Sequence, residues 1–394
     1  MAVTVYRSPP LDALDHEVLS LIDELREQMR HRVSEPRRWN QNLRRMTLAR
    51  AVQGSNSIEG YNASLDDVAA ALGDEPTLSA SEETEHALLG YRDAMTYVLQ
   101  VAQDETATID EGMLKALHFM MLKHELAKSP GRWRPGYVGV RHDGSGEIVY
   151  EGPDADRVPD LIAAMLDDLA QDDGPVLVHA AMAHLNLVMI HPFRDGNGRM
   201  ARCLQTLVLA REQISAPVFS SIEEYLGRNT PAYYDVLAAV GQGAWHPEHD
   251  PLPWVRFCLT AHYRQARTHL RRIEEIEQLW IACAELAGAR SLPERSVGPL
   301  LDAAMGFRIR NASYRSLTEA TAGEEVSDLT ASRDLKALVD AGLLDPVGAN
   351  RGRYYVAAAD VAEMRTQIRA ARPPRADYDP FAVARERLQL RLLD

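Results

Sequence analysis

Cysteine is scarce in this 394-residue chain, and long apolar runs are missing altogether. The three cysteines, Cys203, Cys258 and Cys283, lie far apart within helix-like apolar patterns. Such spacing indicates neither a disulfide framework nor a cysteine-based zinc cluster. No stretch approaches the roughly 20 apolar residues of a membrane span, and the N-terminus lacks a basic segment followed by an apolar one. These absences predict a cytoplasmic protein with no membrane partner.

An excess of basic residues is also absent. The chain has 57 acidic and 43 basic residues and a formal net charge of −14, which argues against a general basic coat for nucleic acid. The distribution is uneven, because residues 59–125 are strongly acidic whereas both ends of the chain are rich in arginine. With 46% hydrophobic residues, the chain is long enough for two or three domains with a sizeable core.

The most informative segment covers residues 191–202 and begins with the letters HPFRDGNGR. Gly196 and Gly198 let backbone N–H groups approach an anion closely, and the apolar stretch 200–210 continues as a helix whose N-terminus faces that anion. Arg199 and Arg202 share one helical face, so both can reach phosphates. The segment therefore predicts a phosphate site. A His-Pro turn before a glycine-rich helix start would explain the glycines but neither the acid nor the arginines.

Two side chains in this segment suit the chemistry of attack on a phosphoryl group. His191 has an ordinary pKa of about 6.5, near the working pH, so we expect it to be the general base. Asp195 is the carboxylate of the loop, and we expect it to bind Mg²⁺ together with phosphate oxygens. Phe193 lies between them and is apolar, so it should point into the core and fix the loop.

In its order of residues the segment resembles the signature of the Fic family, enzymes that transfer part of a nucleotide, usually AMP from ATP, to a hydroxyl of a target protein. The resemblance implies that Asn197 and the backbone at Gly196 and Gly198 hold the phosphates. It places Arg199 and Arg202 toward the β and γ positions, without saying which arginine takes which phosphate. Relatives that transfer in the reverse orientation carry Lys where this chain has Gly198, so the glycine favours nucleotidyl transfer.

Histidines cluster just upstream, which raises the alternative of a zinc site. His179, His184 and His191 are five and seven residues apart, whereas helical metal ligands usually lie three or four apart on one face. The spacing therefore argues against zinc. His184 is expected to be a hydrogen-bonded core histidine that supports the active-site loop.

A second motif, SNSIEG at residues 55–60, follows a periodic apolar stretch and is typical of a helix that ends at Gly60. Glu59 at that helix end opposes the macrodipole by a few tenths to about 1 kcal/mol, which predicts a nearby cation. Ser55 lies on the same face and could orient it. The motif resembles the inhibitory motif of Fic proteins, whose Glu pairs with the second arginine and takes the γ-phosphate position. The alternative is an exposed Glu before a glycine cap.

Two short β-prone runs, residues 137–141 and 147–150, flank the turn-forming letters HDGSG at residues 142–146 and predict a hairpin. In Fic proteins an equivalent hairpin, the flap, borders the active site and pairs with the target segment as an added strand. By that resemblance Val138, Val140 and Ile148 would contact the target. The alternative is a solvent-exposed hairpin that only connects helices.

Most of the remaining chain has the apolar spacing of helices. The expected helices span residues 11–33, 65–72, 82–101, 111–126, 159–170, 176–190, 233–240 and 253–279. Ser64 should cap the second of these helices, with Asp67 completing an approximate capping box.

Composition changes after about residue 292, which marks a separate C-terminal unit. Helices expected at 313–320 and 327–341 precede a hairpin that contains the letters RGRYYV, an order that resembles a winged helix-turn-helix. Arg333 and Lys336 would then enter a DNA major groove, while Arg351 and Arg353 meet phosphates. A fold that serves only protein contacts or dimerisation is an equally good explanation.

Together these features predict a mainly α-helical Fic-type core with a β-hairpin flap and a C-terminal winged helix-turn-helix domain. The expected regions are an N-terminal regulatory region (1–108), a catalytic core (109–262), a connecting helix (263–291), a winged helix (292–358) and a helical tail (359–394). The expected function is Mg²⁺-dependent transfer of AMP from ATP to a hydroxyl of an unknown target protein, inhibited by Glu59. The alternatives are removal of AMP, with Glu59 aligning a water, and a DNA-binding regulator whose core only senses nucleotide. A homodimer is left open.

Overall fold

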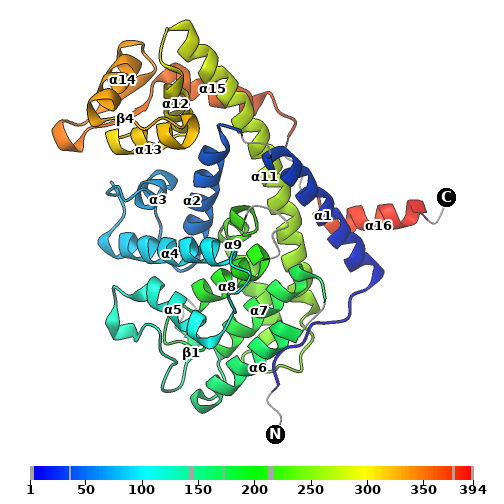
Figure 1. Ribbon diagram of the computed structural model, residues 1–394. Coiled ribbons are helices and arrows are strands. Elements are labelled where there is room, and N and C mark those ends of the chain that lie inside the picture. Colours follow the sequence, from blue (N-terminus) through cyan, green and yellow to red (C-terminus); the bar gives the residue numbers. More distant parts are fainter. Residues whose placement is uncertain are drawn as a thin grey trace.

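The computed structural model describes residues 4–34, 37–141, 146–171, 174–211, 217–374 and 378–391 (Figure 1). Helices make up most of these residues, and the strands pair in two short antiparallel hairpins. The prediction of a mainly α-helical fold is therefore confirmed. None of the described helices is both long and apolar enough to cross a membrane.

The elements follow one another in three groups. The N-terminal region contains α1 (Ala13–Ser34), α2 (Asn40–Ile58), α3 (Leu65–Leu72), α4 (Glu82–Val101) and α5 (Glu111–Leu122). The central region contains η1 (Leu126–Lys128), β1 (Gly139–Arg141), β2 (Ile148–Glu151), α6 (Val158–Gln171), α7 (Val176–Ile190), α8 (Asn197–Arg211), α9 (Glu223–Arg228), α10 (Thr230–Gly241) and α11 (Leu252–Ala289). The C-terminal region contains α12 (Val297–Ala304), α13 (Asn311–Ala322), α14 (Asp328–Asp340), β3 (Leu344–Val347), β4 (Tyr354–Ala357), α15 (Ala359–Ala370) and α16 (Pro380–Arg391).

Serine and aspartate caps explain why several helices begin where the sequence predicts. The side chains of Ser64, Ser81 and Asp110 each accept a hydrogen bond from the backbone N–H three residues on, at the start of α3, α4 and α5. The capping box proposed for Asp67 is wrong. Its carboxylate instead accepts hydrogen bonds from the N–H of Leu78 and from the N–H and hydroxyl of Ser79. These bonds join the 78–79 turn to α3.

Helix α11 differs from its prediction in length. It continues to Ala289, ten residues beyond the expected end at 279, and passes without a break through residue 262. The expected boundary between core and connecting helix therefore falls inside one element. In Figure 1 this helix extends along the molecule and joins the core to the C-terminal region.

Helix α7 forms the centre of the core, and most of its side chains are buried. It packs against α8, α6 and α11, and Trp254 of α11 donates its indole N–H to the carbonyl of Ala181 at 2.7 Å. His184 lies in the same layer, with Nδ1 2.6 Å from Gln205 Oε1 and Nε2 3.0 Å from the Tyr233 hydroxyl. His184 is therefore a hydrogen-bonded core residue, as predicted, and these two partners lie in helices rather than in the 191–196 loop.

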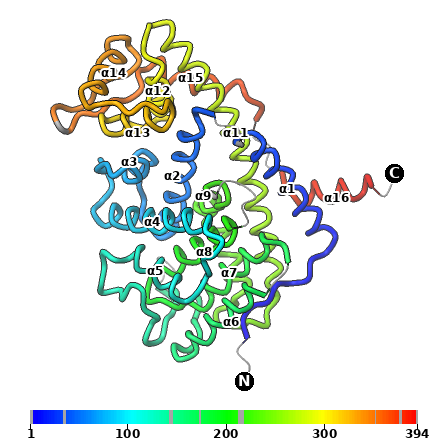
Figure 2. Tube along the Cα trace, in the orientation of Figure 1, coloured from blue at the N-terminus to red at the C-terminus, as the bar shows by residue number. Residues whose placement is uncertain are grey.

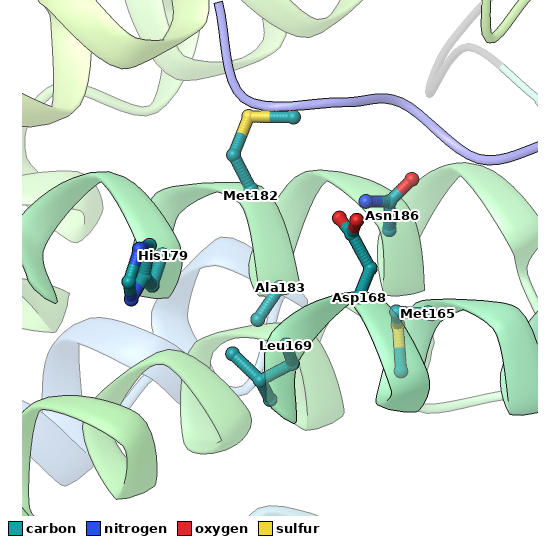
Figure 3. Close-up of a pocket in the computed structure, with 7 residues that line it drawn as sticks. All are labelled: Met165, Asp168, Leu169, His179, Met182, Ala183 and Asn186. Carbon is teal, nitrogen blue, oxygen red and sulfur yellow. The ribbon is translucent and has the colours of Figure 1, made fainter. Parts of the chain in front are cut away.

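The N-terminal segment crosses the outer side of α6 and α7. Figure 3 shows it above Asn186 and Asp168, which come from these two helices. The amide of Asn186 accepts from the N–H of Tyr6 and donates to its carbonyl, both at 2.9 Å, and Asp168 pairs with Arg7. The small pocket in this view is lined by Met165, Asp168, Leu169, His179, Met182, Ala183 and Asn186. Asn186 and Asp168 therefore both line this pocket and anchor the N-terminal segment.

The C-terminal unit packs on the N-terminal region. Its α13 and α14 are followed by the β3–β4 hairpin, and Ile309 adds two backbone hydrogen bonds of 2.8 Å to Tyr355. Helix α12 was not predicted. Figure 2 shows this unit, in orange, at the opposite end of the molecule from α6. Asp302 of α12 is buried and accepts from Asn42 of α2 at 2.6 Å.

Candidate active site

His191 lies at the C-terminal end of α7 in a left-handed backbone conformation, with φ of 52°. Its Nδ1 is 3.1 Å from the carbonyl oxygen of Val188. Because that oxygen can only accept, Nδ1 carries the proton and donates it, and Nε2 keeps its lone pair. Burial lowers the pKa of His191, outweighing this hydrogen bond. His191 is therefore neutral near pH 7, with Nε2 ready to accept a proton.

Arg134 holds the turn that carries His191, and it was not predicted from the sequence. It is buried, and its Nε donates to the carbonyl of His191 at 2.8 Å. Its other guanidinium nitrogens donate to Gly136, at 2.7 Å, and to Pro153, the two ends of the flap. One side chain therefore sets the relative positions of the base and the flap. Only its place in the short GRWR segment before the first strand could have drawn attention to it.

The loop after His191 is closed by Asn197. Its side-chain oxygen accepts from the N–H of Phe193 at 2.8 Å, and its side-chain nitrogen donates to the carbonyl of Phe193 at 2.9 Å. Both polar atoms of the Asn197 side chain thus hold the loop, and its expected contact with phosphate stays a prediction. Phe193 is fully buried and stacks on His118 with 3.7 Å between ring centroids, which confirms its predicted place in the core.

His118 supports the same loop from α5. Its Nδ1 accepts from the N–H of Gly131 at 2.8 Å, so its Nε2 carries the proton and donates to the carbonyl of Asp195 at 2.9 Å. Burial lowers the pKa of His118 to about 4, which keeps this ring neutral at physiological pH. His118 was not predicted as a site residue, because its role depends on two contacts that are distant in sequence.

Asp195, in the loop between α7 and α8, is a candidate metal ligand. Its Oδ1 accepts from the N–H of Gly196 at 2.6 Å, and its Oδ2 lies 2.7 Å from Nζ of Lys128. Burial raises its pKa, but the hydrogen bond and charge of Lys128 outweigh that effect and leave the pKa below its ordinary value. The carboxylate is therefore ionised at neutral pH and a third of its surface is exposed, as a ligand of a hard cation requires.

The N-terminus of α8 is the candidate anion-binding part of the site. The helix begins at Asn197, three residues earlier than predicted, so the N–H groups of its first turn have no acceptor within the helix. Gly196 has φ of 75°, and a Cβ there would come within 3.0 Å of Leu122. A side chain larger than glycine would therefore strain the backbone and crowd α5.

Arg202 lies in the second turn of α8 and is paired with residues of the segment 55–60. Its Nη2 is 2.6 Å from Glu59 Oε1, and its Nε donates to the Ser55 hydroxyl at 2.8 Å. Its guanidinium is completely buried, whereas 23% of the Glu59 side chain is exposed. A Cβ on Gly198 would lie 2.5 Å from Glu59 Oε1, so only glycine leaves room for this carboxylate. The cation predicted for Glu59 is therefore Arg202.

Arg199 presents a second guanidinium to the same region. It is buried, and its carbon Cζ lies 5.1 Å from the centre of the Tyr61 ring, which follows the inhibitory motif. Within the described residues, its Nε and Nη1 have no hydrogen-bond partner. A desolvated guanidinium without an anion is costly, so these donors suit a phosphate oxygen.

The predicted flap forms as an antiparallel hairpin. Val140 pairs with Tyr150 and Arg141 with Ile148, with an irregularity between Val140 and Arg141. Val138 and Val140 are half-buried, whereas Ile148 is 42% exposed. The predicted turn residues 142–145 lie outside the described part of the chain.

The residues expected to contact DNA lie in the C-terminal unit, far from the site. Arg333 and Lys336 of α14 are exposed, and Lys336 pairs with Asp340 of the same helix. Arg353 is exposed beside the β4 strand, and the side chain of Arg351 lies outside the described part.

Comparison with known proteins places these observations in a family. Residues 108–209 match the Fic/DOC family and contain the 191–202 loop, the flap and the helices around them. This part of the chain is therefore a Fic domain. Protein adenylyltransferase Fic of Nematostella vectensis is 27% identical over 63% of this chain and 55% of its own. Protein adenylyltransferase fic-1 of Caenorhabditis elegans is 28% identical over 61% of this chain and 47% of its own.

The chain thus spans about half the length of these curated relatives. Among solved structures, a Fic family protein from Desulfovibrio desulfuricans G20 aligns with a TM-score of 0.56 and 22% identity, covering 90% of this chain and 98% of the other. Fic-1 of C. elegans (residues 134–508) aligns with a TM-score of 0.54 and 22% identity, covering 66% of this chain and 73% of the other. These structural similarities show that the fold is shared.

Proposed function

We propose that this protein is an autoinhibited adenylyltransferase that transfers AMP from ATP to a hydroxyl of a target protein. The observation that carries the proposal is the convergence of His191, the N-terminus of α8 and Arg202 with its Glu59 partner. An inhibited site for nucleotidyl transfer requires a general base, a site for the phosphates, and a carboxylate that occupies the arginine of that phosphate site. The names of the similar proteins, protein adenylyltransferases, support the same reaction.

The proposed reaction uses the lone pair on His191 Nε2. The target hydroxyl loses its proton to Nε2 as its oxygen attacks the α-phosphorus of ATP. The bond between the α-phosphorus and the bridging oxygen breaks, and pyrophosphate leaves with that electron pair. Arg134 holds the imidazole turn in place, and the flap holds the target segment as an added strand. Val138, Val140 and Ile148 are the proposed target contacts.

The triphosphate would bind along the first two turns of α8. Arg199 offers two unpartnered donors and the helix N-terminus offers backbone N–H groups, so a polyphosphate fits these residues. Asp195 would hold Mg²⁺, which would neutralise phosphate charge and help orient the leaving group. Asn197 contributes by fixing the loop through Phe193.

Inhibition follows from the position of Glu59. Its carboxylate takes the guanidinium that would otherwise bind the γ-phosphate, and it lies beside Gly198 at the start of α8. Bound ATP would have to displace this carboxylate from Arg202. We therefore propose that Glu59 and Ser55 keep the free enzyme at low activity.

Intact-mass analysis of the Glu59→Gly variant tests the function. Incubation with ATP, Mg²⁺ and cell lysate should add AMP to the enzyme or to a lysate protein, and the His191→Ala/Glu59→Gly double variant should add none. Supplying pre-modified target would separate transfer from removal, since a de-AMPylating enzyme would lower the target mass instead. Failure of Glu59→Gly to transfer AMP under any Mg²⁺ concentration would contradict the proposal.

DNA binding by the C-terminal unit is a separate proposal. It rests on the helix, helix and hairpin order and on the exposed side chains of Arg333 and Arg353. Binding of the full chain to duplex DNA should weaken steeply with salt and fall in an Arg333→Ala variant. Salt-insensitive or undetectable binding would favour a role in protein contacts.

A further inference from the structure

A polar pocket lies on the opposite side of α2 from the active site. It has a cavity volume of about 120 Å³ and lies where α2 meets α9. Its lining residues are Arg50, Gln53, Gly54, Ser57, Asn62, Ala63, Glu224, Gly227 and Arg228. At 3.6 residues per turn, Arg50, Gln53 and Ser57 point away from Ser55 and Glu59. The same helix therefore contacts Arg202 on one face and this pocket on the other.

Helices α2 and α9 meet backbone to backbone beside the pocket. A Cβ on Gly54 would lie 2.4 Å from the carbonyl oxygen of Glu223, and a Cβ on Gly227 would lie 2.7 Å from the Cα of Gly54. Such contacts leave no space for a side chain on either helix. The position of α2, and with it the position of Glu59, is therefore set by α9.

Positive charge exceeds negative charge at this contact. Glu224 is the only carboxylate among the described residues that line the pocket. It pairs with Arg272, accepts from Arg228 at 2.6 Å and lies 3.6 Å from Arg50. Three guanidiniums thus share one carboxylate. Burial raises the pKa of Glu224, but the hydrogen bond with Arg272 and the charges of the three arginines outweigh that effect, so the pKa falls to about 2 and the carboxylate stays ionised.

Arg50 is the least compensated of these cations. Its distance to Glu224 is too long for a hydrogen bond, and its Nε is buried without a hydrogen-bond partner in the described residues. Burial lowers the pKa of Arg50 to about 10, and repulsion by Arg272 and Arg228 adds to that effect. A desolvated guanidinium at the wall of a pocket, beside other cations, favours an anionic ligand.

We propose that this pocket binds a small polyvalent oxyanion of the phosphate class between Arg50 of α2 and Arg228 of α9. Guanidinium groups bind phosphate oxygens in pairs, and the two arginines belong to the two helices whose contact sets the position of Glu59. The bound anion would join α2 to α9 and keep Glu59 on Arg202. It therefore reinforces the inhibition, a consequence that rests on the proposed function. Free orthophosphate and the pyrophosphate released by AMP transfer share this chemistry.

Calorimetric titration measures anion binding to this pocket. The full-length Arg199→Ala protein is used, because that change removes the proposed phosphate contact of Arg199 in the active site. Orthophosphate and pyrophosphate are titrated separately at constant ionic strength. We expect saturable binding of one equivalent, weakened about tenfold or more by the further change Arg50→Gln, which removes a charge-assisted contact. Arg228→Gln should weaken it as well, and since Arg228 is 49% exposed this variant does not disturb the packing of α2.

Arg44→Gln in the same background is the matched control, because Arg44 is exposed on α2 and does not line the pocket. Binding of orthophosphate would identify free phosphate as a ligand, and binding of pyrophosphate alone would identify the reaction product. The proposal is overturned if neither anion binds the Arg199→Ala protein, or if Arg50→Gln and Arg228→Gln bind as tightly as Arg44→Gln.

The effect on inhibition is read separately. In otherwise unchanged protein, the anion should slow AMP transfer, and Arg50→Gln should remove that slowing. In the Glu59→Gly variant the rate of AMP transfer should no longer depend on the anion in this pocket. An inactive Glu59→Gly protein would contradict the proposed function and leave the binding result to stand by itself, whereas an active Glu59→Gly protein without saturable binding at Arg50 would contradict only this site.

Discussion

Replacing Glu59 with Gln should tighten nucleotide binding, because it removes the negative charge that pairs with Arg202. In the unmodified protein the γ-phosphate of ATP must displace Glu59 from Arg202, where the two groups are 2.6 Å apart. A hydrogen bond between charged groups contributes about 1.5–3 kcal/mol. Since each 1.4 kcal/mol is a factor of ten, we expect the Kd for ATP to fall roughly 10- to 100-fold. The partial exposure of Glu59 favours the lower part of that range.

A graded series makes this expectation sharper. Ser55→Ala removes only a neutral hydrogen-bond acceptor of Arg202, worth about 0.5–1.5 kcal/mol, so ATP should bind up to roughly tenfold more tightly. Arg202→Ala removes the arginine that the phosphate needs and should not tighten binding. Glu83→Gln makes the same change in net charge at an exposed position of α4 and serves as the control.

Calorimetry with a non-hydrolysable ATP analogue and Mg²⁺ measures the series, and intact-mass analysis measures AMP transfer in parallel. The expected order of affinity is Glu59→Gln, then Ser55→Ala, then the unmodified protein together with Glu83→Gln. Equal affinities for Glu59→Gln and Glu83→Gln would refute the reasoning, because the ion pair would then not compete with the nucleotide. Tighter binding by Arg202→Ala would refute the role given to that arginine.

Three further predictions address other parts of the molecule. His191→Ala should abolish AMP transfer in the Glu59→Gly background while calorimetry finds ATP affinity nearly unchanged, since a base acts in the transition state. His191 must be neutral to accept a proton, and burial lowers its pKa, so the rate of transfer should be constant near pH 7 and fall only below about pH 6.5. A rate that begins to fall above pH 7 would contradict this expectation. Asp302→Asn removes the buried carboxylate that holds Asn42 and Arg45 of α2, so it should lower the free energy of unfolding by about 1–3 kcal/mol in thermal unfolding and raise basal AMP transfer. The control Asp345→Asn, at an exposed position of β3, should change neither quantity.

Local patterns predicted the helices well because periodic apolar residues and polar caps act within a few residues of each other. Helix α4 begins and ends at the predicted residues 82 and 101, and Ser81 accepts the capping hydrogen bond at its start. Helix α12 was missed because it is short and contains Gly298 and Pro299, which are poor helix formers. Its position depends on burial against α11 and α13 rather than on propensity.

The site was predictable only where one segment contains the chemistry. His191, Asp195 and Arg199 follow from a continuous motif, and the roles expected of them stay predictions that their hydrogen bonds and burial support. His118 and Arg134 were not predictable, because each acts through hydrogen bonds to residues more than 50 positions away in sequence. Asn197 shows the same limit within the motif. Its residue type suits phosphate binding, but its contacts with Phe193 make it a support of the loop.

The contacts of α2 explain why regulation should concentrate on this helix. Its N-terminal half is held by the C-terminal unit, where Asp302 receives Asn42 and Arg45. Its middle crosses α9 at Gly54, and its last turn carries Glu59 to Arg202. An α-helix is stiff along its axis, so a displacement at either of the first two contacts is passed to Glu59. We therefore expect binding at the C-terminal unit or at the pocket beside α9 to change the availability of Arg202 without contact with the nucleotide.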